Sequence, residues 1–422
     1  MQHILADDIN FGYSMSHLAG LRNSAMNAAV IVAALGYFVD IYDLILFSVV
    51  RVPSLASLGL LPEQITSQGL FLLNMQMAGT LIGGVFWGVL GDKKGRISTL
   101  FGSILLYSLA NTLNAFVVSV EQYAVLRFIA GIGLAGELGV GITLVSEVLP
   151  KDQRGYGTMI VAGIGVTGAL LANLVAKLDW RTAYIVGGIM GLALLLLRIK
   201  VVESDMFSDV KKSDHKKGSL LQLLTTPHLL RRFILCILIG MPTWFVVGIL
   251  VTLAPEFAKE HGITEKISGG DAIAFCYAGL AIGDFLSGWL SQVYKSRRKV
   301  MLQFLTFNAF CFIGYLTIPF SSAIMMYWWI FILGISVGFW AIFVTIAAEQ
   351  FGTNLRATVA TTVPNIARGS LNIISVAFAA LIPMIGMKYA ALCVGLACTA
   401  IAIISVLPLE ETFGKDMNYV EV

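Results

Sequence analysis

The sequence predicts an all-helical membrane protein with twelve transmembrane helices in two six-helix halves. Of its 422 residues, 57% are hydrophobic and only 13% are charged, whereas soluble domains carry roughly 25% charged residues. Twelve apolar segments are long enough to cross a hydrocarbon core about 30 Å thick, at 1.5 Å per helical residue. One long polar interval, 201–227, divides these segments six and six.

The predicted spans follow one another with short loops between them. They lie at about 24–50, 68–90, 97–118, 122–149, 156–177, 181–199, 230–257, 270–293, 300–319, 323–349, 357–385 and 388–408. The N-terminal half then covers residues 1–200, a cytoplasmic linker covers 201–228, and the C-terminal half covers 229–422. No signal peptide is expected, because residues 1–23 lack a basic start followed by an apolar core.

Basic residues set the predicted orientation. If both termini are cytoplasmic, the inner loops hold eighteen Lys and Arg residues and the outer loops hold six. Lys and Arg are enriched on the cytoplasmic side of membrane proteins, so we expect both termini in the cytoplasm. The net charge of +3 then reflects membrane orientation and does not indicate nucleic-acid binding.

A glycine-rich, charged loop joins the second and third spans. It reads Gly88-Val-Leu-Gly91-Asp92-Lys93-Lys94-Gly95-Arg96. Its charges must lie in water or headgroups, because charge at the bilayer centre is costly, and an ordinary positive loop is one interpretation. A related loop, 288–298, recurs at an offset of 200. Glu147 and Arg154, around the end of the fourth span, also recur as Glu349 and Arg356 around the end of the tenth, at an offset of 202.

Ionisable residues inside the spans are candidates for function. Asp40 and Asp43 are three residues apart, so they share one helix face, with Tyr37 one turn away. Asp43 and Arg127 lie at similar depths, about 12 and 8 Å from the outer surface. We expect them to face each other as a proton switch or as a static ion pair. Glu137 is a second protonatable candidate or a structural hydrogen-bonding residue.

The eleventh span carries a polar stripe on one face, at steps of four, three, four and three. It consists of Thr361, Asn365, Arg368, Asn372 and Ser375. Polar side chains are costly when they face lipid, so this helix face should line a water-filled cavity, with Arg368 near the midplane. A guanidinium binds carboxylate or phosphate through a fork of donors. We expect Arg368 to bind an anionic ligand, or alternatively an internal acid such as Asp40, with Trp244 of the seventh span at the same cavity.

Other motifs do not indicate an enzyme. Two GxGxxG strings, at 131–136 and 163–168, lie inside membrane-length spans and lack the strand of a dinucleotide site. The five cysteines lie in apolar spans without a CxxC pair. No cofactor and no metal site are therefore expected.

These motifs resemble the major facilitator superfamily of transporters. The loop at 88–96 is similar to its signature loop between helices 2 and 3. The stretch Arg127-Phe-Ile-Ala-Gly131-Ile-Gly133-Leu-Ala-Gly136-Glu137 is similar to helix 4 of the metabolite:proton symporter and sugar-porter branches. In sugar porters that couple to protons, an Asp of helix 1 pairs with the Arg of helix 4, and by resemblance Asp43 and Arg127 take those places. The resemblance implies two parallel repeats with substrate bound between them near the midplane, and a loop that latches one access state.

The residue patterns and the resemblance together give the expected roles of residues. The expected proton-coupling residues are Asp40, Asp43, Arg127 and Glu137. The expected substrate-binding residues are Tyr37, Trp244, Asn365, Arg368 and Asn372. The expected latch residues are Gly88, Asp92, Gly95, Arg96, Glu147, Arg154, Glu349 and Arg356.

The implied activity is secondary active transport by alternating access. We expect proton-coupled symport that imports a small organic anion, such as a carboxylate metabolite. A proton-driven exporter is the alternative, disfavoured because the glycines at 163–168 lack the proline of the antiporter element. The expected partners are an anionic small-molecule substrate, protons and the lipid bilayer, for a monomer in a bacterial inner membrane.

Overall fold

The computed structural model describes the backbone of residues 2–137, 139, 141, 144–145, 149, 154–197, 220–416 and 419–421. Side chains are described for these residues except 2–29, 62–63, 66, 70, 92, 96–97, 154–155 and 158. Every regular element within this part of the chain is a helix.

The first half contains the helices from α1 to α8. They are α1 (Gln2–Ser57), α2 (Pro62–Lys94), α3 (Arg96–Asn114), α4 (Val120–Leu134), α6 (Arg154–Val166), α7 (Gly168–Ala176) and α8 (Trp180–Leu197). Thr167 alone separates α6 from α7, so the two form one span. A turn at residues 135–136 interrupts the fourth span, which continues through helical residues at 137, 139, 141 and 144–145.

The second half contains the helices from α10 to α18. They are α10 (Leu220–Thr225), α11 (Pro227–Ile239), α12 (Met241–Phe245), the π-helix η2 (Val246–Val251), α13 (Ala254–Glu260), α14 (Gly269–Val293), α15 (Arg297–Thr317), α16 (Ala323–Ser336), α17 (Trp340–Glu349) and α18 (Arg356–Val406). Residues 337–339 break the tenth span between α16 and α17. Gly386 has a φ of 78°, which kinks α18 into two spans.

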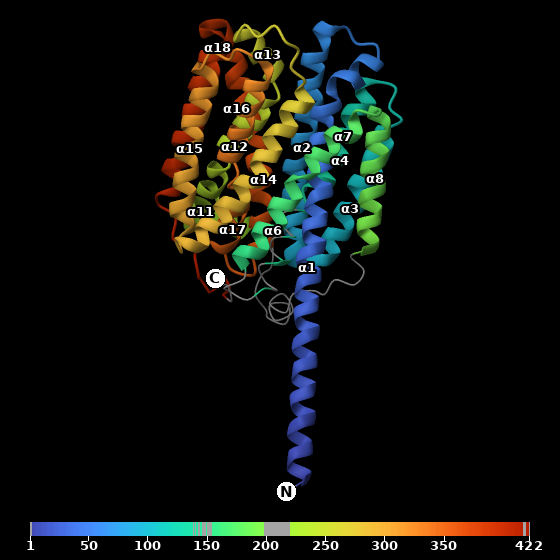
Figure 1. The fold of residues 1–422 in the computed structure, drawn as a ribbon, viewed down its shortest axis with the longest axis vertical. Coiled ribbons are helices and arrows are strands. Elements are labelled where there is room, and N and C mark those ends of the chain that lie inside the picture. The colour runs from blue at the N-terminus through green and yellow to red at the C-terminus, as the bar shows by residue number, and fades with distance from the viewer. Residues whose placement is uncertain are drawn as a thin grey trace.

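As far as its residues are described, each of the twelve predicted segments coincides with one helix, part of a helix or successive helical stretches of this structure. The predicted fold class is therefore confirmed. In Figure 1 the first half, blue to green, stands beside the second half, yellow to red. We call the end of the bundle toward which both termini lie the lower end, and the opposite one the upper end. The predicted linker at 201–228 falls largely outside the described residues.

Glycines bring the two halves into contact at the lower end. A Cβ atom on Gly88 of α2 would lie 2.9 Å from the Thr358 carbonyl oxygen of α18, and one on Gly84 would lie 2.7 Å from Asn365 Cβ. Such distances are closer than a side chain tolerates, so these helices pack through their backbones.

Polar side chains join the halves at the upper end. Asn173 of α7 donates a hydrogen bond to Asp271 of α14 over 3.0 Å, and Lys177 pairs with the same carboxylate at 3.1 Å. The halves therefore meet on both sides of the midplane in this conformation.

Candidate transport site

A small cavity of about 20 Å³ lies between the halves, at the middle of the bundle. This volume holds about one water molecule. The lining residues are Tyr37 and Ile41 of α1, Thr243, Trp244 and Val247 of the seventh span, Tyr277 and Leu280 of α14, Trp340 of α17, and Arg368 of α18. The two halves thus share one polar cavity, which is nearly closed in this conformation.

Arg368 is the cation of this cavity, and only 1% of the residue is exposed. Its Nη1 donates to Asn365 Oδ1 over 3.2 Å. Its Nη2 approaches the Asp40 carboxylate of the other half at 3.6 Å, which is too long for a hydrogen bond. Its Nε has no hydrogen-bond partner among the described residues. The Nε–Nη2 edge could hold a carboxylate with two parallel hydrogen bonds if Nη2 gave up its contact with Asp40.

Asp40 supplies the matching acid. The residue is fully buried, and neither carboxylate oxygen accepts a hydrogen bond from the described part of the chain. Its counter-ion is Arg368. The structure thus pairs Arg368 with the internal acid that the sequence offers as an alternative partner.

Asn365 and Asn372 differ in their placement on the polar stripe. Asn365 positions Arg368, and its Nδ2 donates to the Ala135 carbonyl at the interruption of the fourth span over 2.8 Å. This contact ties α18 to α4. Asn372 is half-buried, with its Oδ1 unpartnered among the described residues. Neither Asn365 nor Asn372 is among the residues that line the cavity.

Asp43 and Arg127 are both fully buried, but their side chains are not bonded to each other in this conformation. Arg127 donates to Asn111 Oδ1 over 2.5 Å and to Gln76 Oε1 over 3.5 Å. Within the described residues, neither Asp43 oxygen has a hydrogen-bond partner. These charges lie inside the first half, apart from the cavity between the halves. Glu137 is also buried, just after the turn that interrupts the fourth span.

The expected latch residues are only partly described. The side chains of Asp92, Arg96 and Arg154, and the whole of Glu147, lie outside the described residues. Gly95 has a φ of 109° and ends α2, a conformation that favours glycine. Gly88 makes the close contact with α18 given above.

In the second half, Glu349 forms a bidentate pair with Arg297 at 2.6 and 2.8 Å. Both side chains are about 5% exposed. Arg356 is fully buried at the start of α18. Nearby, Glu411 of the C-terminal segment accepts hydrogen bonds from Ser296 and the Arg297 backbone. Burial opposes ionisation of Glu411, but these hydrogen bonds hold its pKa below its usual range.

Sequence reasoning missed Asp284, a fully buried acid in the middle of α14. Its Oδ1 accepts a hydrogen bond from the Ala341 backbone over 3.1 Å, which caps the N-terminus of α17. Trp340, the first residue of α17, lines the cavity. An acid inside an apolar span was a visible signal for Asp284, whereas the break before Trp340 left no comparable signal.

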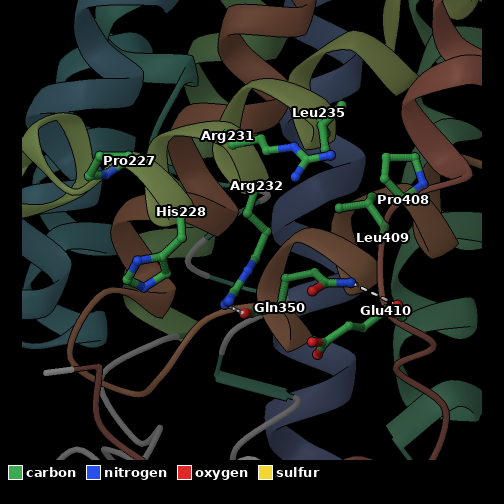
Figure 2. Close-up of a pocket in the computed structure, with 9 residues that line it drawn as sticks. All are labelled: Pro227, His228, Arg231, Arg232, Leu235, Gln350, Pro408, Leu409 and Glu410. Carbon is green, nitrogen blue, oxygen red and sulfur yellow. Dashed lines mark hydrogen bonds between the residues drawn. The ribbon is translucent and has the colours of Figure 1, made fainter.

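A larger cavity, of about 370 Å³, lies at the lower end of the second half. Figure 2 shows its lining residues, which come from the start of α11, from Gln350 after α17 and from residues 408–410. Arg232 in its wall is held by the Gln350 carbonyl at 2.7 Å and by Glu421 at 3.2 Å. None of the residues lining it in Figure 2 belongs to the first half, so this cavity is not the one that alternating access would open to each side in turn.

The helical halves and the charged cavity between them define a membrane transporter rather than an enzyme. The family profile described as Major Facilitator Superfamily matches residues 24–376. The chain belongs to this family.

Known members show the extent of the similarity. The sialic acid transporter NanX of Escherichia coli is 25% identical over 72% of this chain and 74% of its own. The putative niacin/nicotinamide transporter NiaP of Bacillus subtilis is 24% identical over 78% of this chain and 81% of its own. The solved structure of the proton:xylose symporter XylE shares the fold, with a TM-score of 0.74 and 15% identity over 94% of this chain and 98% of that one.

Proposed function

We propose that this protein imports a small organic monocarboxylate together with a proton. The observation that carries the proposal is the incompletely bonded guanidinium of Arg368, which is buried in the cavity between the halves. Its Nε has no partner within the described residues, and its Nη2 is only loosely paired with Asp40 at 3.6 Å. A carboxylate that binds both nitrogens gains better geometry than Asp40 provides.

Coupling to a proton follows from this exchange of partners. When a substrate carboxylate occupies Arg368, Asp40 loses its counter-ion while it remains buried. An uncompensated carboxylate in such a place is strongly disfavoured, so Asp40 takes up a proton. One proton then enters the site with each monocarboxylate, and the site keeps its net charge.

We place the coupling proton on Asp40 rather than on Asp43. Asp40 contacts Arg368, the cation of the opposite half, so the charge of Asp40 changes the attraction between the two halves. Asp43 lies near Arg127 in the first half, where Asn111 and Gln76 hold the guanidinium. Arg127 and Asp43 then stabilise the first half, and Glu137 remains a second candidate proton carrier.

Alternating access follows from the two contact regions between the halves. Separation of Gly88 from Thr358 would open the lower end, and separation of Asp271 from Lys177 would open the upper end. The excess of basic residues near the lower end supports a cytoplasmic location for it, with both termini in the cytoplasm. An inward proton gradient then drives import.

The relatives support the chemistry of the substrate. NanX is named for sialic acid, and NiaP is named for niacin and nicotinamide. Sialic acid and niacin are organic acids that share a carboxylate, the group that a guanidinium binds through two parallel hydrogen bonds; nicotinamide is the uncharged amide of niacin.

The test is uptake of radiolabelled carboxylates into proteoliposomes that contain the purified protein. We expect one or more monocarboxylates to accumulate against their gradient when the lumen is made alkaline. Accumulation should vanish with a proton ionophore and with Arg368→Ala, while the matched surface variant Arg231→Ala keeps it. Accumulation only with an acidic lumen would indicate export, and uptake unchanged by Arg368→Ala would refute the site.

A further inference from the structure

Aromatic rings form much of the wall beside Arg368. Tyr37, Trp244, Tyr277 and Trp340 all line the cavity. Trp244 and Trp340 meet edge to face, with ring centroids 6.1 Å apart. The Arg368 guanidinium lies over the Trp244 ring at 5.9 Å. The wall therefore offers faces and edges that suit another aromatic ring, since such pairs prefer offset-stacked or edge-to-face arrangements.

Three of the residues that line the same cavity carry unsatisfied donors. Besides Arg368 Nε, the Trp244 Nε1 and the Thr243 hydroxyl are buried without a hydrogen-bond partner in the part of the chain that is described. Donors without acceptors are costly when buried. A bound carboxylate, with two oxygens and four lone pairs, satisfies several of them at once.

The other lining groups are apolar. Ile41, Val247 and Leu280 complete the wall. A ligand with many hydroxyl groups would leave them unpaired against these side chains, at a cost for each. One cation also matches one anionic group, because a second carboxylate would be buried without a counter-ion.

We infer that the substrate is a small planar aromatic monocarboxylate, whose carboxylate binds Arg368 and whose ring lies among Trp244, Trp340 and the two tyrosines. This inference rests on the proposed function, because it concerns the same site. It adds that the cavity selects a flat apolar ring over a sugar acid, a dicarboxylate or an aliphatic acid of equal size. In the present conformation the walls are drawn together, and the ring separates them when it enters.

The test is equilibrium binding of radiolabelled benzoate to the purified protein, in competition with unlabelled compounds at acidic pH. Cyclohexanecarboxylate has a similar size and the same charge but no π face, so we expect it to compete about tenfold less well than benzoate, the difference expected for one or two aromatic contacts. Isophthalate, with a second carboxylate, and the polyhydroxylated acid gluconate should not compete.

A pair of variants localises the effect. Trp340→Leu should remove most of the preference for benzoate over cyclohexanecarboxylate. Trp328→Leu, in the same span but 55% exposed on the outside of α16, should leave it unchanged. Equal competition by benzoate and cyclohexanecarboxylate in the unmodified protein would overturn the inference and leave the proposed function intact.

A third compound distinguishes binding of the carboxylate by Arg368 from the preference for an aromatic ring. Benzamide has the ring without the charge. If benzamide competes as well as benzoate, the anion site itself is refuted, whatever the ring preference. If benzoate fails to bind while other monocarboxylates are transported, the ring inference is wrong and the proposed function stands.

Discussion

The substitution Asp40→Asn removes the internal competitor for Arg368 and imitates the protonated acid. At 3.6 Å, two unit charges attract by about 5 kcal/mol at an effective dielectric constant of about 20. Most of this attraction is regained when a substrate carboxylate replaces Asp40. The net competition is therefore closer to one charge-assisted hydrogen bond, about 1.5–3 kcal/mol.

At pH values at which Asp40 is ionised in the unmodified protein, the Asp40→Asn variant should bind the transported carboxylate more tightly than the unmodified protein does. The expected gain is roughly 10- to 100-fold, because 1.4 kcal/mol corresponds to a factor of ten. In the unmodified protein, affinity should fall about tenfold per pH unit above the titration of Asp40, since binding takes up one proton. In Asp40→Asn this pH dependence should disappear.

The assay is equilibrium binding of the labelled carboxylate between pH 5.5 and 8.5, with gel filtration as a check on folding. Counterflow in proteoliposomes should survive in the variant, while uphill accumulation is lost. Asp43→Asn is the matched control and should keep the pH dependence. Weaker binding in Asp40→Asn at pH 8, or an unchanged pH dependence, would refute the exchange of partners at Arg368.

Three other substitutions test separate parts of the account. Arg368→Lys should restore little of the binding lost in Arg368→Ala, because Lys lacks the bidentate fork; near-normal affinity in Arg368→Lys would argue against a two-point contact. Gly88→Leu should hold the lower end open, seen as faster labelling of a cysteine placed there, whereas Gly141→Leu, whose Cβ position has ordinary contacts at 3.8 Å, should not. Glu349→Gln should destabilise the protein by roughly 3–5 kcal/mol because it leaves a buried arginine unpaired. Glu410 is exposed, so Glu410→Gln should barely shift the melting temperature. Equal shifts of the melting temperature in Glu349→Gln and Glu410→Gln would contradict a stabilising role for the pair of Glu349 with Arg297.

The fold followed closely from the sequence because the bilayer imposes it. Backbone groups inside hydrocarbon must be paired within the segment, so an apolar run of about 20 residues has to be a helix. The internal repeat that relates Glu147 and Arg154 to Glu349 and Arg356 then indicated the two halves. The break at residues 337–339 was not predicted; just after it the Ala341 backbone donates to Asp284 of another helix, a contact that no local spacing encodes.

The site was harder to predict, because residues that contact each other from different spans follow no regular spacing in the sequence. Depth counted along each helix suggested Asp43 opposite Arg127, but helix rotation and side-chain reach decide actual contacts. Arg127 is held by Asn111 and Gln76. Of the polar stripe, only Arg368 is among the residues that line the cavity. Its contact with Asp40 joins residues 328 positions apart by number, which only the packing of the two halves can produce.

The most direct test of the central claim is the number of protons taken up when the carboxylate binds. Purified protein in weakly buffered solution at pH 7.5 is mixed with saturating substrate, and the pH change is recorded with an indicator dye. We expect uptake of about one proton per bound carboxylate in the unmodified protein and in Asp43→Asn. In Asp40→Asn we expect none. Binding without proton uptake in the unmodified protein, or undiminished uptake in Asp40→Asn, would contradict this claim.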